Sequence, residues 1–248
     1  MSDAERIEIL NVGFDDLDLN GAVELALERI RAHGGGWVVT PNSEIVLECR
    51  RNPQLAAAVR EAVLVIPDGI GVLYAARLLK TPLREKIAGI DFACALMEQM
   101  AKTDGSVYLF GAKPGVAEAA AKTLLERYPG LRVCGTRDGY FSDDAPIAAD
   151  IREKQPDLVL VCLGAPKQEL WMREHAAELD AGLLIGLGGS LDVFAGTVQR
   201  APEGWQRLGL EWLYRLLKEP KRIRRMIRLP LILLLAVRES VFGKKAGA

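Results

Sequence analysis

Short runs of apolar residues alternate along the chain with longer segments in which apolar residues recur every three or four positions. Uninterrupted apolar runs are typical of strands buried on both faces, as in parallel sheets, and the longer spacing predicts helices. The predicted strands occupy residues 7–12, 37–40, 63–66, 107–110, 131–135, 158–163 and 183–187. Strands that alternate with helices through short turns predict an α/β fold with a doubly wound, mostly parallel, Rossmann-like sheet.

The strand at residues 158–163 is followed by the most informative turn. Gly164 ends the apolar run, Pro166 suits the first position of a helix, and Lys167 and Gln168 fall in the first helical turn. Open α/β sheets bind ligands at the carboxyl edge, where free helix N–H groups, an amide and a lysine suit a phosphate or a sugar. An ordinary strand-to-helix turn with a solvated polar face explains the same residues.

Turns at other strand ends give further candidate substrate-binding or catalytic positions. Thr40 and Asn42 lie at the end of the second predicted strand, and Asp68 follows the third. Gly111 opens the turn after residues 107–110, and Asp192 follows the strand at 183–187. Helix capping by Asn42 and ordinary Asp-Gly turn chemistry at Asp68 are the structural alternatives.

A metal site has little support in the sequence. Asp16 and Asp18 match a D-x-D motif in form, but they precede an amphipathic stretch at residues 19–32 and do not follow a core strand. Capping of that helix is the favoured explanation. The two histidines, His33 and His175, belong to no close cluster of ligands. We therefore expect no cofactor and metal-independent chemistry.

The C-terminal part of the chain differs from the rest in charge. The net charge is −1, yet residues from 201 onward carry 11 Lys or Arg against 4 Asp or Glu, a balance of +7. The remaining residues have a balance of −8. This polarity suggests a basic end that meets phosphate-bearing partners. We predict a core at residues 1–203 and a basic, helical, membrane-associating appendage at residues 204–248, called the appendage below.

Within the appendage, residues 205–218 are amphipathic, basic residues follow, and residues 229–237 form an apolar run of nine that contains Pro230. Nine residues are too few to span a bilayer, which takes roughly 20. Basic residues beside apolar ones suit the surface of an anionic membrane. A helix that packs on the core is the alternative. The acidic body and the absence of a groove-reading motif disfavour nucleic acid.

The remaining composition points to the cytoplasm. None of the four cysteines forms a C-x-x-C pair, so they are interpreted as small buried apolar residues in a reducing compartment. The N-terminus is polar and does not resemble a signal peptide.

The turns and the appendage together resemble the WecG/TagA/CpsF family of bacterial glycosyltransferases. Each matching piece is short, but their joint order is specific and covers nearly the whole chain. The pieces are residues 40–44 (TPNSE), 67–69 (PDG), 88–91 (AGID), 164–169 (GAPKQE), 188–192 (GGSLD), 195–196 (AG), 200–202 (RAP), 209–212 (GLEW), 214–216 (YRL) and 219–220 (EP).

This resemblance implies a function. Members of the family make cell-surface glycans by moving a sugar from a UDP-sugar to a lipid-diphosphate-linked sugar at the inner face of the membrane. The best-known activity transfers N-acetylmannosamine to undecaprenyl-diphosphate N-acetylglucosamine, with inversion. We therefore expect a UDP-sugar donor, a polyprenyl-diphosphate-linked acceptor and a peripheral location on the cytoplasmic membrane face. A homo-oligomer is left open.

The resemblance also implies roles for individual residues. Asp68 matches the proposed catalytic base, and Thr40, Asn42 and Gln168 match substrate-contacting positions. Basic positions thought to complete the site near the membrane are matched by Arg215, Arg222 and Arg225. Lys86 stands where the family usually has arginine, so the positive charge is kept but the two-pronged guanidinium is lost.

Two other classes of protein remain as alternatives. A nucleotide-binding oxidoreductase or epimerase would suit the sheet, but no glycine-rich dinucleotide fingerprint follows the first strand. A non-catalytic membrane adaptor would use the appendage alone, which leaves the polar turns at the strand ends unexplained.

Overall fold

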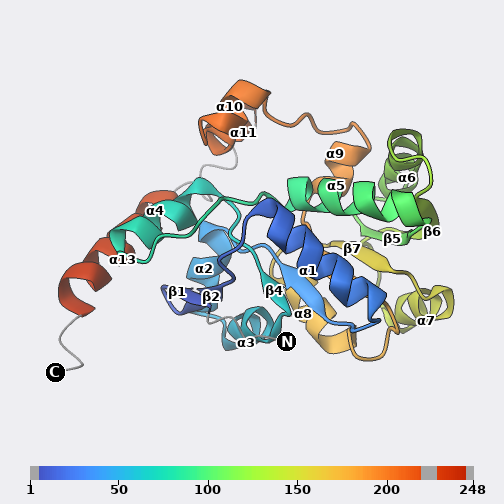
Figure 1. The fold of residues 1–248 in the computed structure, drawn as a ribbon, viewed down its shortest axis with the longest axis horizontal. Helices are drawn as coiled ribbons and strands as arrows, with labels where there is room; N and C mark the ends of the chain where they lie inside the picture. The colour runs from blue at the N-terminus through green and yellow to red at the C-terminus, as the bar shows by residue number, and fades with distance from the viewer. Residues whose placement is uncertain (1–5, 219–227, 244–248) are drawn as a thin grey trace.

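The computed structural model describes residues 6–218 and 228–243 and contains a six-stranded, all-parallel sheet (Figure 1). The strand order is β4-β3-β8-β7-β5-β6. The α/β prediction is therefore confirmed. The strands are β3 (Trp37–Val39), β4 (Leu64–Val65), β5 (Ser106–Gly111), β6 (Arg132–Arg137), β7 (Leu158–Cys162) and β8 (Leu183–Gly186).

The central strands β5, β7 and β8 are buried along their full length, as their apolar runs predict. Their registers are continuous, with Val107 opposite Leu158 and Leu158 opposite Leu183. Successive side chains point to opposite faces of the sheet and enter two separate apolar clusters, so that Val159 and Leu160 lie in different ones. The sheet thus separates two hydrophobic clusters, one on each of its faces.

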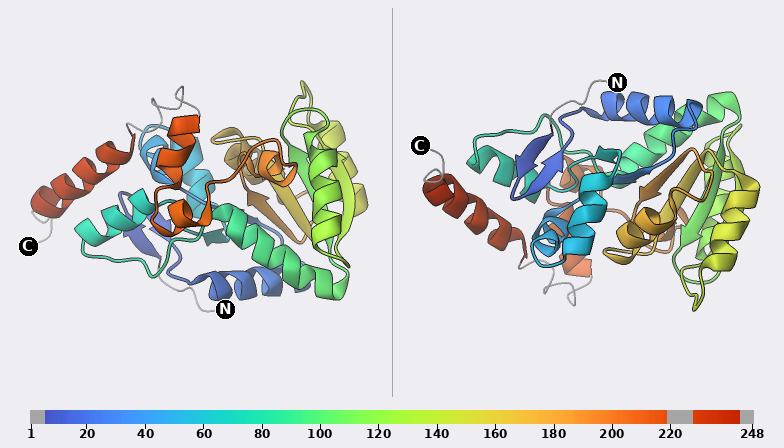
Figure 2. Two further views of the ribbon diagram at one scale, coloured as in Figure 1. Left: turned by 90° about the horizontal axis from the view of Figure 1, so that it is seen from above. Right: turned by 90° about the horizontal axis from the view of Figure 1, so that it is seen from below.

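Helices cover both faces of the sheet (Figure 2). One layer contains α1 (Leu19–Arg31), α5 (Gly89–Met100), α6 (Val116–Arg127) and α9 (Ser190–Phe194), with the short 3₁₀ helix η1 (Ala101–Thr103) after α5. The other layer contains α2 (Ser43–Cys49), α3 (Pro53–Glu61), α4 (Ile70–Leu78), α7 (Ala145–Lys154) and α8 (Lys167–His175).

A topological switch point lies between the neighbouring strands β3 and β8. The chain leaves β3 into α2 on one face of the sheet and leaves β8 into α9 on the other face. A crevice outside the carboxyl ends of such strands is where doubly wound sheets bind ligands. The turns after β3, β8 and the adjacent β4 lie at this switch point.

Residues 7–12 do not form one strand of the main sheet, contrary to the prediction. They contribute to an antiparallel hairpin of β1 (Ile7–Ile9) and β2 (Val12–Phe14). Leu10 and Asn11 have φ angles of 53° and 69°, which make the tight two-residue turn. The apolar pattern hid this turn because Leu10 is itself buried in the core.

The acidic residues before α1 act as local hydrogen-bond acceptors. The Asp18 carboxylate caps α1 by accepting from the N–H of Gly21 at 2.8 Å, and Asp16 accepts from the N–H of Arg84 at 2.7 Å. The capping interpretation of Asp18 is therefore confirmed. Among the residues that the structure describes, no group of three or more His, Cys, Asp or Glu could hold a metal ion.

The amphipathic stretch at residues 205–218 forms two short helices, α10 (Glu203–Arg207) and α11 (Glu211–Lys218). Gly209 breaks the helix with a φ of 69°. A Cβ at this position would lie 3.2 Å from Cγ1 of Ile70, so the turn approaches the start of α4 closely. The break therefore divides the stretch into two helices, a feature that the periodicity of the sequence did not predict.

The apolar run near the C-terminus forms α13 (Arg228–Phe242), which packs against α4 and α2 (Figures 1 and 2). Ile232 and Ala236 are fully buried in the core, whereas Leu234 and Phe242 are 66% and 72% exposed. One face of α13 is therefore a docking face, as the alternative interpretation expected, and another face presents apolar side chains to solvent. None of the helices within the described ranges is long and apolar enough to cross a membrane.

Candidate active site

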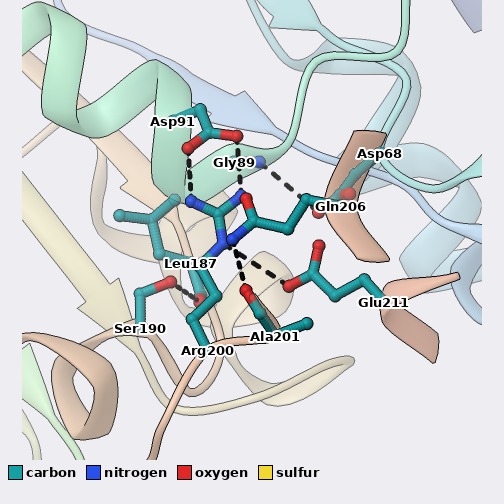
Figure 3. A network of polar contacts seen from close by, with 9 residues as sticks. All are labelled: Asp68, Gly89, Asp91, Leu187, Ser190, Arg200, Ala201, Gln206 and Glu211. Atoms are coloured by element: carbon teal, nitrogen blue, oxygen red, sulfur yellow. Dashed lines mark hydrogen bonds and ion pairs between the residues drawn. The ribbon is translucent and has the colours of Figure 1, made fainter. Parts of the chain in front are cut away.

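Asp68 lies in the turn directly after β4, at the carboxyl edge of the sheet. Its backbone N–H donates to the carbonyl of Pro41 at 3.2 Å, and Oδ2 of its half-buried side chain accepts from the N–H of Gly89 at 3.4 Å (Figure 3). Gly89 is the first residue of α5, where backbone N–H groups lack intrahelical acceptors and favour a negative partner. The carboxylate therefore lies at the edge of the sheet, facing the start of α5.

Thr40 and Asn42 lie beside Asp68. A Cβ on Gly89 would be 3.1 Å from Oγ1 of Thr40, and one on Gly69 would be 3.6 Å from Cβ of Asn42. Thr40 is 8% exposed, and its hydroxyl donates to the carbonyl of Gly186 at 3.4 Å, across to β8. The structure thus brings three of the predicted site residues together at the switch point.

Asn42 also has the capping role expected from its position. Its Oδ1 accepts from the N–H groups of Glu44 at 2.9 Å and Ile45 at 3.2 Å, at the start of α2. The capping interpretation is therefore confirmed. A substrate contact by Asn42 stays a prediction, and it would use the Nδ2 group, since Oδ1 serves the helix.

Gln168 is 3% exposed and joins two glycine turns at the carboxyl edge. Its Oε1 accepts from the N–H of Gly164 at 3.2 Å and of Gly188 at 2.9 Å. Its Nε2 donates at 2.8 Å to Glu169, whose pKa burial raises above the usual range. The amide ties the β7–α8 turn to the β8–α9 turn, and direct contact with a substrate stays a prediction.

These contacts predict what Gln168→Leu would do. The substitution removes the acceptor for two partly buried N–H groups, so we expect the free energy of unfolding to fall by about 1–3 kcal/mol. Denaturant unfolding measures this. Gln99→Leu is a matched control, because Gln99 makes an exposed contact with Lys102. If Gln168→Leu were as stable as the unchanged protein and only raised KM, Gln168 would instead be a substrate contact.

Gly111 and Asp192 lie at the same edge but outside the cluster around Asp68. Gly111 is the last residue of β5, and Asp192 lies in α9, after β8. The φ of Gly111 is 129°, and a Cβ there would collide with the backbone of Cys162 on β7, so close strand packing explains the glycine. Asp192 lies in the first turn of α9, and its backbone carbonyl accepts from the hydroxyl of Thr197 at 2.9 Å. Substrate binding by either residue stays a prediction.

The backbone segments that contain Lys86 and Asp68 lie side by side. The N–H of Ile87, the residue after Lys86, donates to the carbonyl of Pro67, the residue before Asp68, at 2.9 Å. Lys167, which the sequence made a candidate to bind a phosphate or a sugar, has partners within the protein. Its Nζ donates to the carbonyl of Gly139 at 3.3 Å and lies 3.8 Å from the ring centre of Phe141. A contact of the Lys86 side chain with a substrate stays a prediction.

The described parts of the appendage reach the residues next to Asp68. Gly209 lies against Ile70, as noted above, and Leu229 at the start of α13 lies so close to Gly71 that a Cβ on Gly71 would collide with it. Arg228 forms ion pairs with Glu44 at 3.2 Å and Glu48 at 3.6 Å, which join α13 to α2. Arg215 lies in α11. Arg222 and Arg225 lie outside the described residues.

The chain matches the model of the Glycosyl transferase WecG/TagA/CpsF family over residues 7–246. It belongs to this family. The matched residues include the sheet, the C-terminal helices and all of the motif pieces named above. The protein is therefore a glycosyltransferase, and the carboxyl edge around Asp68 is the candidate site of sugar transfer.

Two relatives in the WecG/TagA/CpsF family are similar to this chain over most of its length and carry the same name. A protein of Bacillus spizizenii is 36% identical over 223 residues, which cover 90% of this chain and 87% of the relative. A protein of Staphylococcus aureus is 32% identical over 235 residues, which cover 94% and 92%. Both are named N-acetylglucosaminyldiphosphoundecaprenol N-acetyl-beta-D-mannosaminyltransferase.

One set of charged residues in this WecG/TagA/CpsF member received no role from the sequence. Both terminal nitrogens of Arg200 bond the carboxylate of Asp91, and Nε lies 3.5 Å from Oε1 of Glu211 (Figure 3). The bonds to Asp91 raise the pKa of Arg200 above its usual value. All three residues belong to motif pieces noted above, which was the available signal. Their separation along the chain concealed that they meet.

Proposed function

We propose that this glycosyltransferase moves N-acetylmannosamine from a UDP-sugar to an undecaprenyl-diphosphate-linked N-acetylglucosamine. The product would serve the synthesis of teichoic acid or another cell-surface polysaccharide. The names of relatives that align with most of the chain support the sugar and the acceptor. The observation that carries the proposal is the carboxylate of Asp68 beside Thr40 and Asn42 at the switch point of the sheet.

The reaction is a single displacement. The acceptor hydroxyl attacks the anomeric carbon of the donor, the bond from that carbon to the diphosphate oxygen breaks, and UDP leaves with the bonding electrons. Asp68 takes the proton of the attacking hydroxyl as general base. One displacement inverts the anomeric configuration. The backbone N–H of Gly89 holds the Asp68 carboxylate in place for this step.

The departing diphosphate needs positive charge. The backbone at Lys86 lies next to the turn that contains Asp68. We assign stabilisation of the diphosphate to Lys86 and to Arg215, Arg222 and Arg225. Arginine suits it because the guanidinium donates two parallel hydrogen bonds to a phosphate. The described residues on either side of 219–227 belong to α11 and α13, and contacts of the appendage with Ile70 and Gly71 support this assignment.

The membrane-bound acceptor also requires a place for its lipid. The solvent-facing apolar side chains of α13, among them Leu234, Val241 and Phe242, suit the interface of a bilayer, and α13 follows the basic stretch of the appendage. We propose that the protein lies peripherally on the cytoplasmic face of the membrane through this surface.

A screen of donors tests the proposal. The protein is incubated with a short-chain lipid-diphosphate N-acetylglucosamine and, separately, the UDP derivatives of N-acetylmannosamine, N-acetylglucosamine and glucose. We expect mass spectrometry to find an acceptor that is heavier by one N-acetylhexosamine with the first donor. Binding of NAD without transfer from any UDP-sugar would support the oxidoreductase alternative. Lipid binding with neither transfer nor UDP-sugar hydrolysis would support an adaptor.

A further inference from the structure

Arg200 occupies the junction between the core and the appendage (Figure 3). Its two terminal nitrogens form a two-pronged contact with Asp91 in the first turn of α5, in which Nη2 lies 2.7 Å from Oδ2. Its Nε faces Glu211, the first residue of α11, at 3.5 Å. The side chain is 20% exposed. One guanidinium therefore lies between a core helix and an appendage helix.

On the core side, Arg200 contacts Asp91, which is close to the proposed base Asp68. Asp91 lies two residues after Gly89, whose N–H donates to Asp68. Gly89 is buried, and it packs on Thr40 and Leu187 so closely that a Cβ would be 3.1 Å from each. Because Gly89 and Asp91 share one helical turn, a shift of Asp91 moves the donor that holds Asp68.

On the appendage side, Arg200 contacts Glu211 of α11, and α10 and α11 are joined to each other by contacts of their own. The N–H of Leu210 donates to the carbonyl of Trp205 at 2.8 Å, and the rings of Trp205 and Tyr214 meet with centroids 5.7 Å apart. The side chain of Gln206 bonds the carbonyl of Ala201, directly after Arg200. The ion pair of Arg200 with Glu211 therefore restrains both helices. The contact of Gly209 with Ile70 restrains them at a second point.

The chemistry of the contact explains why arginine suits this position. Asp91 and Glu211 are both acidic and approach the same group, so the positive charge between them offsets their repulsion. Arginine presents several donors in a rigid plane and can bond one carboxylate with its fork while Nε faces another. Lysine has a point charge and cannot reproduce that geometry.

We propose that Arg200 is a positioning residue for sugar transfer. By bridging Asp91 and Glu211 it seats α10 and α11 against the carboxyl edge and fixes the first turn of α5, which holds Asp68. The catalytic part of this proposal rests on the function proposed above, whereas the seating of the helices does not.

Hydrogen exchange tests the seating without any substrate. In Arg200→Gln we expect faster amide exchange in peptides that cover residues 203–218 and in the first turn of α5, with Arg200→Lys in between. Arg173→Gln is the matched control, because Arg173 forms a similar two-pronged pair with Glu61, between α8 and α3. Unchanged exchange in Arg200→Gln, as in the control, would overturn the proposal.

Kinetics test the positioning. Misplacement of a base costs up to about 10²-fold in rate, so we expect Arg200→Gln to lower kcat by that order while KM for the donor changes little. Asp91→Asn breaks the same contact, so the double variant should be no slower than Arg200→Gln alone. Losses that multiply, or a loss confined to KM, would contradict the role.

The two sets of results separate the proposals. If the unchanged protein transferred no sugar from any UDP donor, the proposed function would fail, and hydrogen exchange would still decide the seating role of Arg200. If it transferred sugar but Arg200→Gln kept its kcat, the positioning role would fail and the function would stand.

Discussion

Asp68→Asn is expected to lower kcat by roughly 10² to 10⁴-fold, the usual contribution of a general base. Asparagine has the shape of aspartate, and its Oδ1 can still accept from the N–H of Gly89, so the turn should keep its structure. What the variant loses is the ability to take the proton of the acceptor hydroxyl. The measurement is the rate of lipid-linked product formation at saturating donor and acceptor.

Asp138→Asn is the control for this loss. Asp138 accepts from the N–H of Tyr140 at 2.8 Å in an exposed turn, and asparagine keeps that acceptor as well. The control should therefore retain full activity. An unchanged kcat in Asp68→Asn would show that another group removes the proton.

Arg222→Gln/Arg225→Gln is expected to have the second large effect, a loss of about 10² to 10³-fold in kcat. Groups that stabilise charge developing in a transition state contribute on this scale, and the diphosphate gains charge as the sugar leaves. Both residues lie outside the described part of the chain, so the prediction rests on the basic positions of the family that they match. The support from structure is that Gly209, just before α11, and Leu229, in α13, lie against Ile70 and Gly71, close in sequence to Asp68.

A charge-matched control isolates this effect. Arg31→Gln/Arg152→Gln removes two exposed positive charges from the last turns of α1 and α7, and its activity should be unchanged. Deletion of the whole appendage is less informative, since it removes Ile232 and Ala236 from the core along with the arginines. Equal activity in both double variants would remove the tail arginines from the mechanism.

The sheet could be predicted because its central strands are apolar on both faces. Residues of β5, β7 and β8 face a helical layer on each side, and apart from Ser106 at the start of β5 their sequences have no polar position that would interrupt the apolar runs. The hairpin at the N-terminus was missed because the turn residue Leu10 is buried and apolar. The division of residues 205–218 was missed because only the conformation of Gly209 reveals it.

The candidate site was predictable where it follows strand ends. Thr40, Asn42 and Asp68 each lie in the turn that follows a strand, and parallel strands bring their carboxyl ends to one edge. The bridge from Arg200 to Asp91 spans 109 positions in the sequence, and no local pattern encodes such a contact. The same holds for the amide of Gln168, because the direction of a polar side chain depends on the two turns that it joins.

A crystal structure with UDP bound tests the central claim most directly, because it shows where the donor lies relative to Asp68. We expect the diphosphate at the carboxyl ends of β3, β4 and β8, beside the turn that holds Asp68. The claim would be contradicted by UDP bound in the surface hollow that α5 and the C-terminal end of α6 line with Cys94, Glu98 and Tyr128 as well as Asp91, with the edge at Asp68 left open.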